Sequence, residues 1–208
     1  PPEGSPANQL FADVTGEAGL DFTHSENRFV DFNREPLIPK KVSTEGPHLA
    51  TADVNGDGLE DLYIGGAKEQ AGRLLVQQPD GRYAASSTAT FEADRIAEDV
   101  GAAFFDADGD GDQDLYVVSG GNAFSPGTPA LQDRLYLNTG GQFERARTLP
   151  SLTLSGSCVR PADYDGDGDT DLFVGGRVVP WRYGLTPQSV LLENDGAGQF
   201  RVVTDEVA

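Results

Sequence analysis

Three acidic stretches, at residues 53–61, 106–114 and 163–171, carry the side chains best suited to chemistry. Each places Asp or Asn at its first, third and fifth positions, Asp at its ninth, and Gly at its fourth and sixth. Calcium prefers about six to eight hard oxygen ligands in a flexible geometry. Glycine lets the backbone curl around an ion because it tolerates positive φ. The spacing therefore predicts three Ca²⁺ sites.

We expect the side chains at positions 1, 3, 5 and 9 to be ligands, together with the backbone carbonyl at position 7. Leu59, at position 7 of the first stretch, is informative because its apolar side chain cannot coordinate an ion. The predicted ligands at position 7 are the backbone carbonyl oxygens of Leu59, Asp112 and Asp169. The predicted side-chain ligands are Asp53, Asn55, Asp57, Asp61, Asp106, Asp108, Asp110, Asp114, Asp163, Asp165, Asp167 and Asp171.

Three other interpretations of these stretches fit less well. An EF-hand requires a bidentate Glu at position 12 and flanking helices, but position 12 is Ile64, Val117 or Val174, each inside an apolar run. A solvated acidic turn without metal is a fair alternative for one stretch, but not for three in register, because packed like charges repel. Mg²⁺ is less suitable, since it prefers octahedral, water-rich sites.

The elements that must position these stretches recur along the chain. Their first aspartates lie at residues 53, 106 and 163, and a short strand of small residues precedes each stretch while an apolar strand follows it. A third strand, a tight glycine turn and a fourth strand complete each unit. Four short antiparallel strands in about 50 residues are typical of a propeller blade. We therefore predict an all-β fold, a β-propeller of four-stranded antiparallel blades with about three blades present.

The repeats suggest a division of the chain. Residues 1–9 are expected to form a flexible linker and residues 10–47 an outer strand followed by an irregular excursion. Blades are expected at 48–90, 91–146 and 147–208. The expected outer strand resembles the last strand of the third blade. Three blades leave unpaired edges and an apolar flank, so we expect a continuation of the chain or a second protomer to complete the ring.

Composition excludes several classes of function. The formal net charge of −19 argues against a nucleic-acid partner, which requires clustered Lys and Arg. The chain has no apolar run of about 18 residues, which predicts no membrane insertion, and no signal peptide is visible at Pro1. Cys158, the single cysteine, is expected to be a small buried hydrophobe in a strand.

The acidic pattern, D-x-D/N-G-D-G-x-x-D-L followed by a short strand, resembles the FG-GAP/VCBS repeat of integrin α-subunit propellers. The opening segment, residues 10–24, is similar to the start of cartilage-acidic-protein and ASPIC/UnbV-type proteins. The resemblance implies a seven-bladed Ca²⁺-binding propeller in secreted or cell-surface proteins, extracellular or periplasmic, without catalytic activity. The presence of only three blades departs from that family pattern.

Function is therefore expected to lie in binding. The two histidines, His24 and His48, accompany no nucleophile, phosphate-binding or zinc motif, so we predict no enzyme. Integrin-like propellers bind partners on the face away from their Ca²⁺ loops. In this chain that face would carry the candidate partner-binding residues Phe124, Trp181, Arg182 and Tyr183, types enriched at binding hot spots.

Two functions remain open. The first is an extracellular module for adhesion to, or recognition of, a protein or glycan. The second is a structural subunit of a larger assembly, joined through open blade edges and the N-terminal strand. Packing of Trp181 into a neighbouring blade is the alternative to a role for its side chain in binding.

Overall fold

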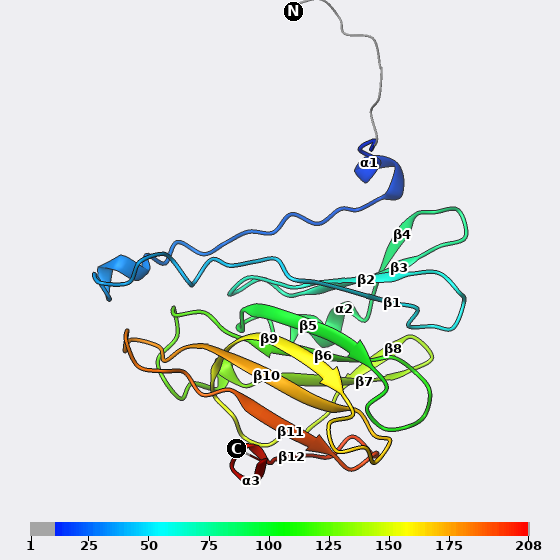
Figure 1. Ribbon diagram of the computed structural model, residues 1–208. Helices are drawn as coiled ribbons and strands as arrows, with labels where there is room; N and C mark the ends of the chain where they lie inside the picture. The colour runs from blue at the N-terminus through cyan, green and yellow to red at the C-terminus, as the bar shows by residue number, and fades with distance from the viewer. Residues whose placement is uncertain (1–10, 208) are drawn as a thin grey trace, which may run out of the picture.

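Three four-stranded antiparallel sheets, lying side by side in chain order, form the protein in the computed structural model, which describes residues 11–207 (Figure 1). Each sheet is an antiparallel meander. The prediction of an all-β fold built from four-stranded blades is confirmed, and the arrangement is consistent with part of a propeller. We call the sheets blades 1, 2 and 3.

The strands of blade 1 are β1 (Leu49–Ala52), β2 (Asp61–Ile64), β3 (Arg73–Gln77) and β4 (Tyr83–Ser86). Those of blade 2 are β5 (Asp99–Phe105), β6 (Asp114–Ser119), β7 (Arg134–Thr139) and β8 (Gln142–Arg145). Those of blade 3 are β9 (Ser155–Ala162), β10 (Asp171–Val178), β11 (Val190–Asn194) and β12 (Phe200–Val202). The short helices are α1 (Thr15–Ala18), η1 (Asp31–Asn33), α2 (Thr88–Glu92), η2 (Pro129–Leu131) and α3 (Thr204–Val207). Within the described range, none of them could cross a bilayer.

The hydrophobic core lies between blades. The first strand of the middle blade, β5, adjoins both β1 and β9, and β6 in the same blade is buried along its whole length. Its side chains alternate between faces, as a strand requires. Leu115 and Val117 join the cluster shared with blade 1, whereas Tyr116 and Val118 join the cluster shared with blade 3. Each blade interface is therefore a core of its own.

The N-terminal segment differs from the prediction. Residues 11–14 form no strand, and Thr15–Ala18 is a helical turn. The Asp13 carboxylate accepts a hydrogen bond from the Thr15 backbone N–H, and Gly19 ends the turn in the left-handed conformation. These local bonds, with no buried residue in the turn, explain why no outer strand forms here. The predicted linker at 1–9 and Leu10 lie outside the described residues.

The excursion before blade 1 folds back toward the end of blades 2 and 3 that carries the β6–β7 and β10–β11 connections (Figure 1). Its anchor is Asp31, which is fully buried and accepts hydrogen bonds from the Val42 and Ser43 backbone N–H groups and from the Ser43 hydroxyl. The Ser43 hydroxyl in turn accepts from the Asn122 N–H of blade 2. The segment is therefore tied to the sheets by buried polar contacts.

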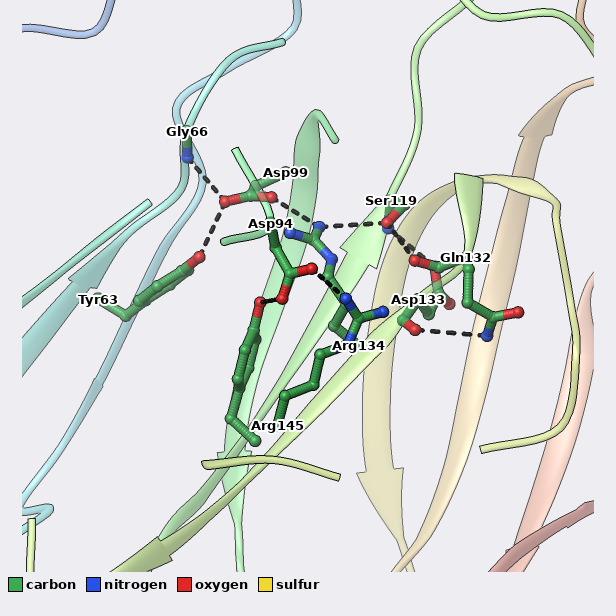
Figure 2. Close-up of polar contacts among 10 residues, drawn as sticks. Tyr63, Gly66, Asp94, Asp99, Ser119, Gln132, Asp133, Arg134 and Arg145 are labelled. Atoms are coloured by element: carbon green, nitrogen blue, oxygen red, sulfur yellow. Dashed lines mark hydrogen bonds and ion pairs between the residues drawn. The ribbon is translucent and has the colours of Figure 1, made fainter. Parts of the chain in front are cut away.

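A buried polar network joins blades 1 and 2 (Figure 2). Asp99 accepts hydrogen bonds from the Tyr63 hydroxyl and the Gly66 N–H, both at 2.8 Å, and pairs with the Arg134 guanidinium at 2.7 Å. Arg134 also donates to the Ser119 hydroxyl. Both charges of the ion pair are almost completely shielded from solvent, so each depends on the other for compensation.

This network predicts unequal effects of two substitutions. Asp99→Asn leaves the Arg134 charge buried without a counter-ion and should lower the free energy of unfolding by about 3–5 kcal/mol. Tyr63→Phe removes one donor to the charged Asp99 carboxylate but leaves the ion pair in place, so it should cost less, about 1.5–3 kcal/mol. Tyr83→Phe is the control, because the Tyr83 hydroxyl makes only a long, exposed bond of 3.4 Å. Urea denaturation of wild type and the three variants checks this, and equal losses for Asp99→Asn and Tyr83→Phe would contradict it.

Glu98 is the least satisfied buried acid in the described range. It is 3% exposed, and neither carboxylate oxygen has a hydrogen-bond partner among the described residues. Burial raises the pKa of Glu98 to about 8, helped by the nearby charges of Glu26, Asp31 and Asp99 and opposed by Lys68. The folded protein therefore holds this proton at a pH where the unfolded chain releases it.

This difference predicts a pH dependence of stability. Because the folded pKa is raised, the contribution of Glu98 is fully present below about pH 4.5 and is lost as the pH rises through 8. In that window wild type should lose up to about 1.4 kcal/mol per pH unit relative to Glu98→Gln. Denaturation curves across the window measure this difference, with the exposed Glu92→Gln as control. Parallel pH profiles for wild type and Glu98→Gln would contradict the prediction.

Candidate metal centres

The three acidic stretches form the loops β1–β2, β5–β6 and β9–β10, at the same end of all three blades (right in Figure 1). We call them loops 1, 2 and 3. Antiparallel pairing of the first two strands fixes both ends of each loop, with Ala52 opposite Asp61, Phe105 opposite Asp114, and Ala162 opposite Asp171. The sheet thus supplies a rigid frame for each loop.

The first aspartate organises the backbone of each loop. In loop 1 the Asp53 carboxylate accepts hydrogen bonds from the N–H groups of Gly56 and Gly58 at 2.8 and 2.7 Å. Both glycines have positive φ, 75° and 82°, which favours glycine at these positions. Hydrogen bonding, led by the Gly58 N–H, lowers the pKa of Asp53. Asp106 and Asp163 make the equivalent bonds in loops 2 and 3.

Carboxylate oxygens converge in loops 2 and 3. Each cluster offers three carboxylates with one oxygen apiece, and those oxygens lie within 4.8 Å of one another, so each could hold a metal ion. In loop 2, one oxygen of Asp108 is buried and has no hydrogen-bond partner among the described residues. The clusters consist of Asp106, Asp108 and Asp110 in loop 2 and of Asp163, Asp165 and Asp171 in loop 3.

Loop 1 differs because its third residue is Asn55. The Asn55 Oδ1 accepts from the Asp57 N–H, and its Nδ2 donates to the Asp57 carboxylate at 3.1 Å. Loop 1 therefore offers two carboxylates and an amide where loop 2 offers three carboxylates. Its backbone bonds from Asp53 are nevertheless those of the other two loops.

The ninth aspartate of each loop is a buried double acceptor. Asp114 accepts from the Ala107 N–H at 2.8 Å and from the Asn138 N–H of β7 at 2.7 Å. Asp61 and Asp171 make the same pair of bonds in their blades. Position 9 thus ties the start of its loop to the third strand of its sheet, a role that the sequence alone did not reveal.

The seventh residue of loops 2 and 3 is an aspartate whose side chain lies beside a hairpin turn. The Asp112 carboxylate accepts from the Gly140 N–H in the β7–β8 turn at 2.8 Å. Asp169 lies against Gly196 in the β11–β12 turn, where a Cβ atom would meet its carboxylate at 2.5 Å. These two side chains face the turns of their own blades, leaving their backbone carbonyls as the donors these residues could offer to the loops.

Mutual repulsion in the loops favours a positive partner. Burial raises the pKa of Asp114 to about 6, with further contributions from Asp108 and Asp110. Burial and neighbouring carboxylates likewise raise the pKa of Asp61 and Asp165. Hard oxygen donors, high negative charge and a flexible glycine loop are the donor set that suits Ca²⁺. The residues present therefore fit this ion.

At the opposite end of the blades lie the connections between the second and third strands. Phe124 is buried with Ala130 and Leu131, and the Lys68 ammonium lies 4.9 Å from its ring centroid. This burial contradicts a direct contact between Phe124 and a partner. Trp181, Arg182 and Tyr183, by contrast, are exposed.

Trp181 is held in an unusual conformation. Its φ is 65°, a left-handed value that is rare for a bulky residue. Its N–H donates to Asn122 Oδ1, the Tyr183 N–H donates to Glu35, and the Arg34 guanidinium lies 4.0 Å from the centroid of the Trp181 ring. Segments 31–37 and 179–185 are therefore held together, and the Arg34 guanidinium partly covers the indole.

A pocket of about 340 Å³ lies at the beginning of β1 and contains a histidine. Its polar lining consists of Glu45, His48, Ser157 and Arg177. The Ser157 hydroxyl donates to the Gly175 carbonyl, and no hydrogen bond joins Ser157 to His48 among the described residues. Burial lowers the pKa of His48. In this pocket the described residues therefore form no hydrogen-bonded pair of a hydroxyl nucleophile and a histidine base.

Sequence reasoning missed two asparagines: Asn138, the second-to-last residue of β7, and Asn194, the last residue of β11. Both are buried, and both donate from their side chains to carbonyls of the acidic loops. Their recurrence at one position of the repeat was the signal that could have found them. Cys158, expected to be buried, is only partly so.

Comparison with known proteins agrees with this geometry. The family model described as FG-GAP-like repeat matches the chain twice, at residues 53–117 and 106–174. Each match begins at the first aspartate of an acidic loop and runs into the next blade. No individual curated protein matches the chain. Repeat, sheet and loop together show that the chain belongs to the family of FG-GAP-like repeat proteins.

Proposed function

We propose that this chain is a non-enzymatic, Ca²⁺-binding propeller module that recognises a protein or glycan ligand outside the cell. One observation carries the proposal: the acidic loops lie at one end of the blades and the β10–β11 connection at the other (Figure 1), and that connection holds the exposed Trp181, Arg182 and Tyr183. Ion binding and ligand recognition would then use separate ends of one rigid scaffold. The FG-GAP-like repeat supports a binding module over an enzyme.

In this proposal each loop binds one ion through the side chains at positions 1, 3, 5 and 9 and the carbonyl at position 7. Bound Ca²⁺ would supply the positive charge that the clustered carboxylates lack. The proposed role of the ion is structural, because it would stiffen the hairpin between the first two strands. With the Kd of about 10⁻⁴–10⁻³ M that is typical of extracellular modules, these loops would be filled only in a calcium-rich compartment.

The proposed recognition surface comprises the exposed residues of segments 31–37 and 179–185. It presents Trp181, Arg182, Tyr183 and Leu185 from blade 3, and the other segment contributes the exposed Phe32 of η1. Tryptophan, tyrosine and arginine are the types most enriched at binding hot spots. The strained backbone of Trp181 is consistent with function, since such conformations persist where the surroundings fix them.

A structural role in a larger assembly is the second candidate. It is supported by the outward faces of the first and last blades, where Leu49 is 60% and Phe173 is 46% exposed. Phe173 occupies the position of Tyr63 and Tyr116, both of which are buried against the following blade. A second copy of this chain could cover these apolar faces.

Removal of calcium tests the first part of the proposal. At a free Ca²⁺ concentration ten times its Kd, each site adds about 1.4 kcal/mol to the free energy of unfolding. Chelation should therefore lower the melting temperature by at least several degrees. Asp108→Asn, which removes one carboxylate from loop 2, should show a smaller calcium-dependent shift, whereas the exposed Asp80→Asn should match wild type.

Two measurements on these samples could each contradict one part of the proposal. An unchanged melting temperature on chelation would contradict calcium binding in the loops. Light scattering on the same samples measures the mass in solution. A stable dimer or ring that disperses on Phe173→Ser would favour the assembly role over the recognition role.

Substitution of the recognition surface tests the second part. Wild-type protein in Ca²⁺ would be screened against a glycan array and a library of extracellular proteins. For any ligand found, Trp181→Ala or Tyr183→Ala should weaken binding by about thirtyfold or more, as expected for a hot spot. Phe173→Ser, on the far flank of blade 3, should leave the affinity unchanged. The opposite pattern would place the ligand on the blade flank and contradict the proposed surface.

A further inference from the structure

A single buried side chain connects each pair of consecutive acidic loops. Asn138, the second-to-last residue of the third strand of blade 2, is 1% exposed. Its Nδ2 donates to the Val54 carbonyl in loop 1 at 2.7 Å and to the Gln113 carbonyl in loop 2 at 3.1 Å. Its Oδ1 accepts from the Gly141 N–H, which fixes the orientation of the carboxamide. Both donors of one amide are thus shared between two loops.

The same connection recurs one blade further on. The Nδ2 of Asn194 donates to the Ala107 carbonyl in loop 2 at 2.8 Å and to the Thr170 carbonyl in loop 3 at 3.2 Å. Asn194 occupies the same position in blade 3 as Asn138 in blade 2, because each backbone N–H donates to the ninth aspartate of its own loop. The two asparagines therefore link loops 1, 2 and 3 in series.

The hairpin turn after each asparagine lies between the same two loops. In blade 2, Gly140 donates to Asp112 of loop 2, while a Cβ on Gly141 would lie 3.1 Å from the Asn55 Cβ of loop 1. In blade 3, a Cβ on Gly196 would meet Asp169 of loop 3, whereas the Gly196 carbonyl lies near loop 2. When one loop moves, the hairpin turn must therefore either pass the movement on to the neighbouring loop or absorb it.

Blade 1 provides an internal comparison for the hydrogen-bonded link that Asn138 and Asn194 make between loops. Gln77 is the counterpart of the two asparagines in blade 1, since its N–H donates to Asp61 at 2.8 Å. Among the described residues, no loop precedes it. Val54 and Ala107, whose carbonyls accept the asparagine bonds, are 2% and 1% exposed, whereas their counterpart Tyr164 in loop 3 is 37% exposed. The buried link therefore exists between loops only.

We propose that Asn138 and Asn194 are positioning residues that couple calcium binding between neighbouring loops, so that an ion in one loop strengthens binding in the next. The inference rests on the proposed calcium sites. A carboxamide held by one ordered loop presents its second donor in the correct place for the other. The second ion then meets a loop that is already ordered, which lowers the entropic cost of binding.

Thermodynamic linkage sets the size and symmetry of the effect. If loop 2 strengthens loop 1, loop 1 must strengthen loop 2 by the same factor. We expect coupling of about fivefold, at the lower end of typical allosteric coupling. Electrostatic repulsion between bound ions would instead weaken binding at the neighbouring loop, and it does not require the asparagines.

Calcium titration followed by NMR can resolve the three loops. The backbone amides of Gly58, Gly111 and Gly168 each donate to the first aspartate of their own loop and report on that loop alone. Weakening loop 2 with Asp108→Asn should weaken binding at loops 1 and 3 by about fivefold. In an Asn138→Ala background, the same substitution should no longer affect loop 1 but should still affect loop 3.

Matched variants complete the experiment. In an Asn194→Ala background, Asp108→Asn should no longer affect loop 3 but should still affect loop 1. Gln77→Ala should leave all three titrations unchanged. If Asn138→Ala does not fold, Asn138→Ser retains one donor, enough for one carbonyl, and should still uncouple the loops. Three independent titrations in the wild type, or coupling that survives Asn138→Ala and Asn138→Ser, would overturn the inference. No calcium response at any glycine would overturn the proposed calcium sites themselves.

Discussion

A carboxylate buried at the end of each acidic loop is the constraint on which the rest of this structure depends. Asp61, Asp114 and Asp171 each accept two backbone hydrogen bonds, one from the beginning of the loop and one from the third strand. In each case one carboxylate oxygen takes the loop donor and the other takes the strand donor. The loop is thereby fixed to its sheet, and the remaining carboxylates are brought close together at the surface.

That arrangement creates an electrostatic cost that the blades alone do not remove. Carboxylates crowd into each loop while buried apolar cores hold the sheets together behind them. The ion pair between Asp99 and Arg134 shows how the protein treats buried charge elsewhere, with a partner of opposite sign at 2.7 Å. In the loops the described residues offer no such partner to the converging carboxylates. We propose that a bound cation fills this role.

Local patterns in the sequence predicted the blades, but contacts between distant segments could not be predicted in this way. The four-strand meander and the glycine conformations follow from alternation and from the spacing of Gly and Asp. The strand expected at the N-terminus was wrong because local bonding by Asp13 and Gly19 favours a helical turn. The links made by Asn138 and the isolation of Glu98 depend on residues more than 20 positions away.

The predicted recognition residues also show that contacts between distant segments cannot be predicted from local patterns in the sequence. Trp181, Arg182 and Tyr183 are exposed because the 31–37 segment holds their loop in place, whereas Phe124 packs into a small cluster of its own. Residue type identified all four, but only the fold separates an exposed aromatic from a buried one. The exposed surface and the acidic loops occupy opposite ends of the blades, so calcium would act on recognition only through the rigidity of the sheets.

Calcium in the acidic loops is the central claim, and native mass spectrometry of the chain measures it most directly. We predict that protein transferred from a calcium-containing buffer carries three Ca²⁺ ions, and that Asp53→Ala, Asp106→Ala and Asp163→Ala each remove at least one of them. A chain that carries no calcium under these conditions, or that binds the same number of ions after all three substitutions, would contradict calcium binding by these loops.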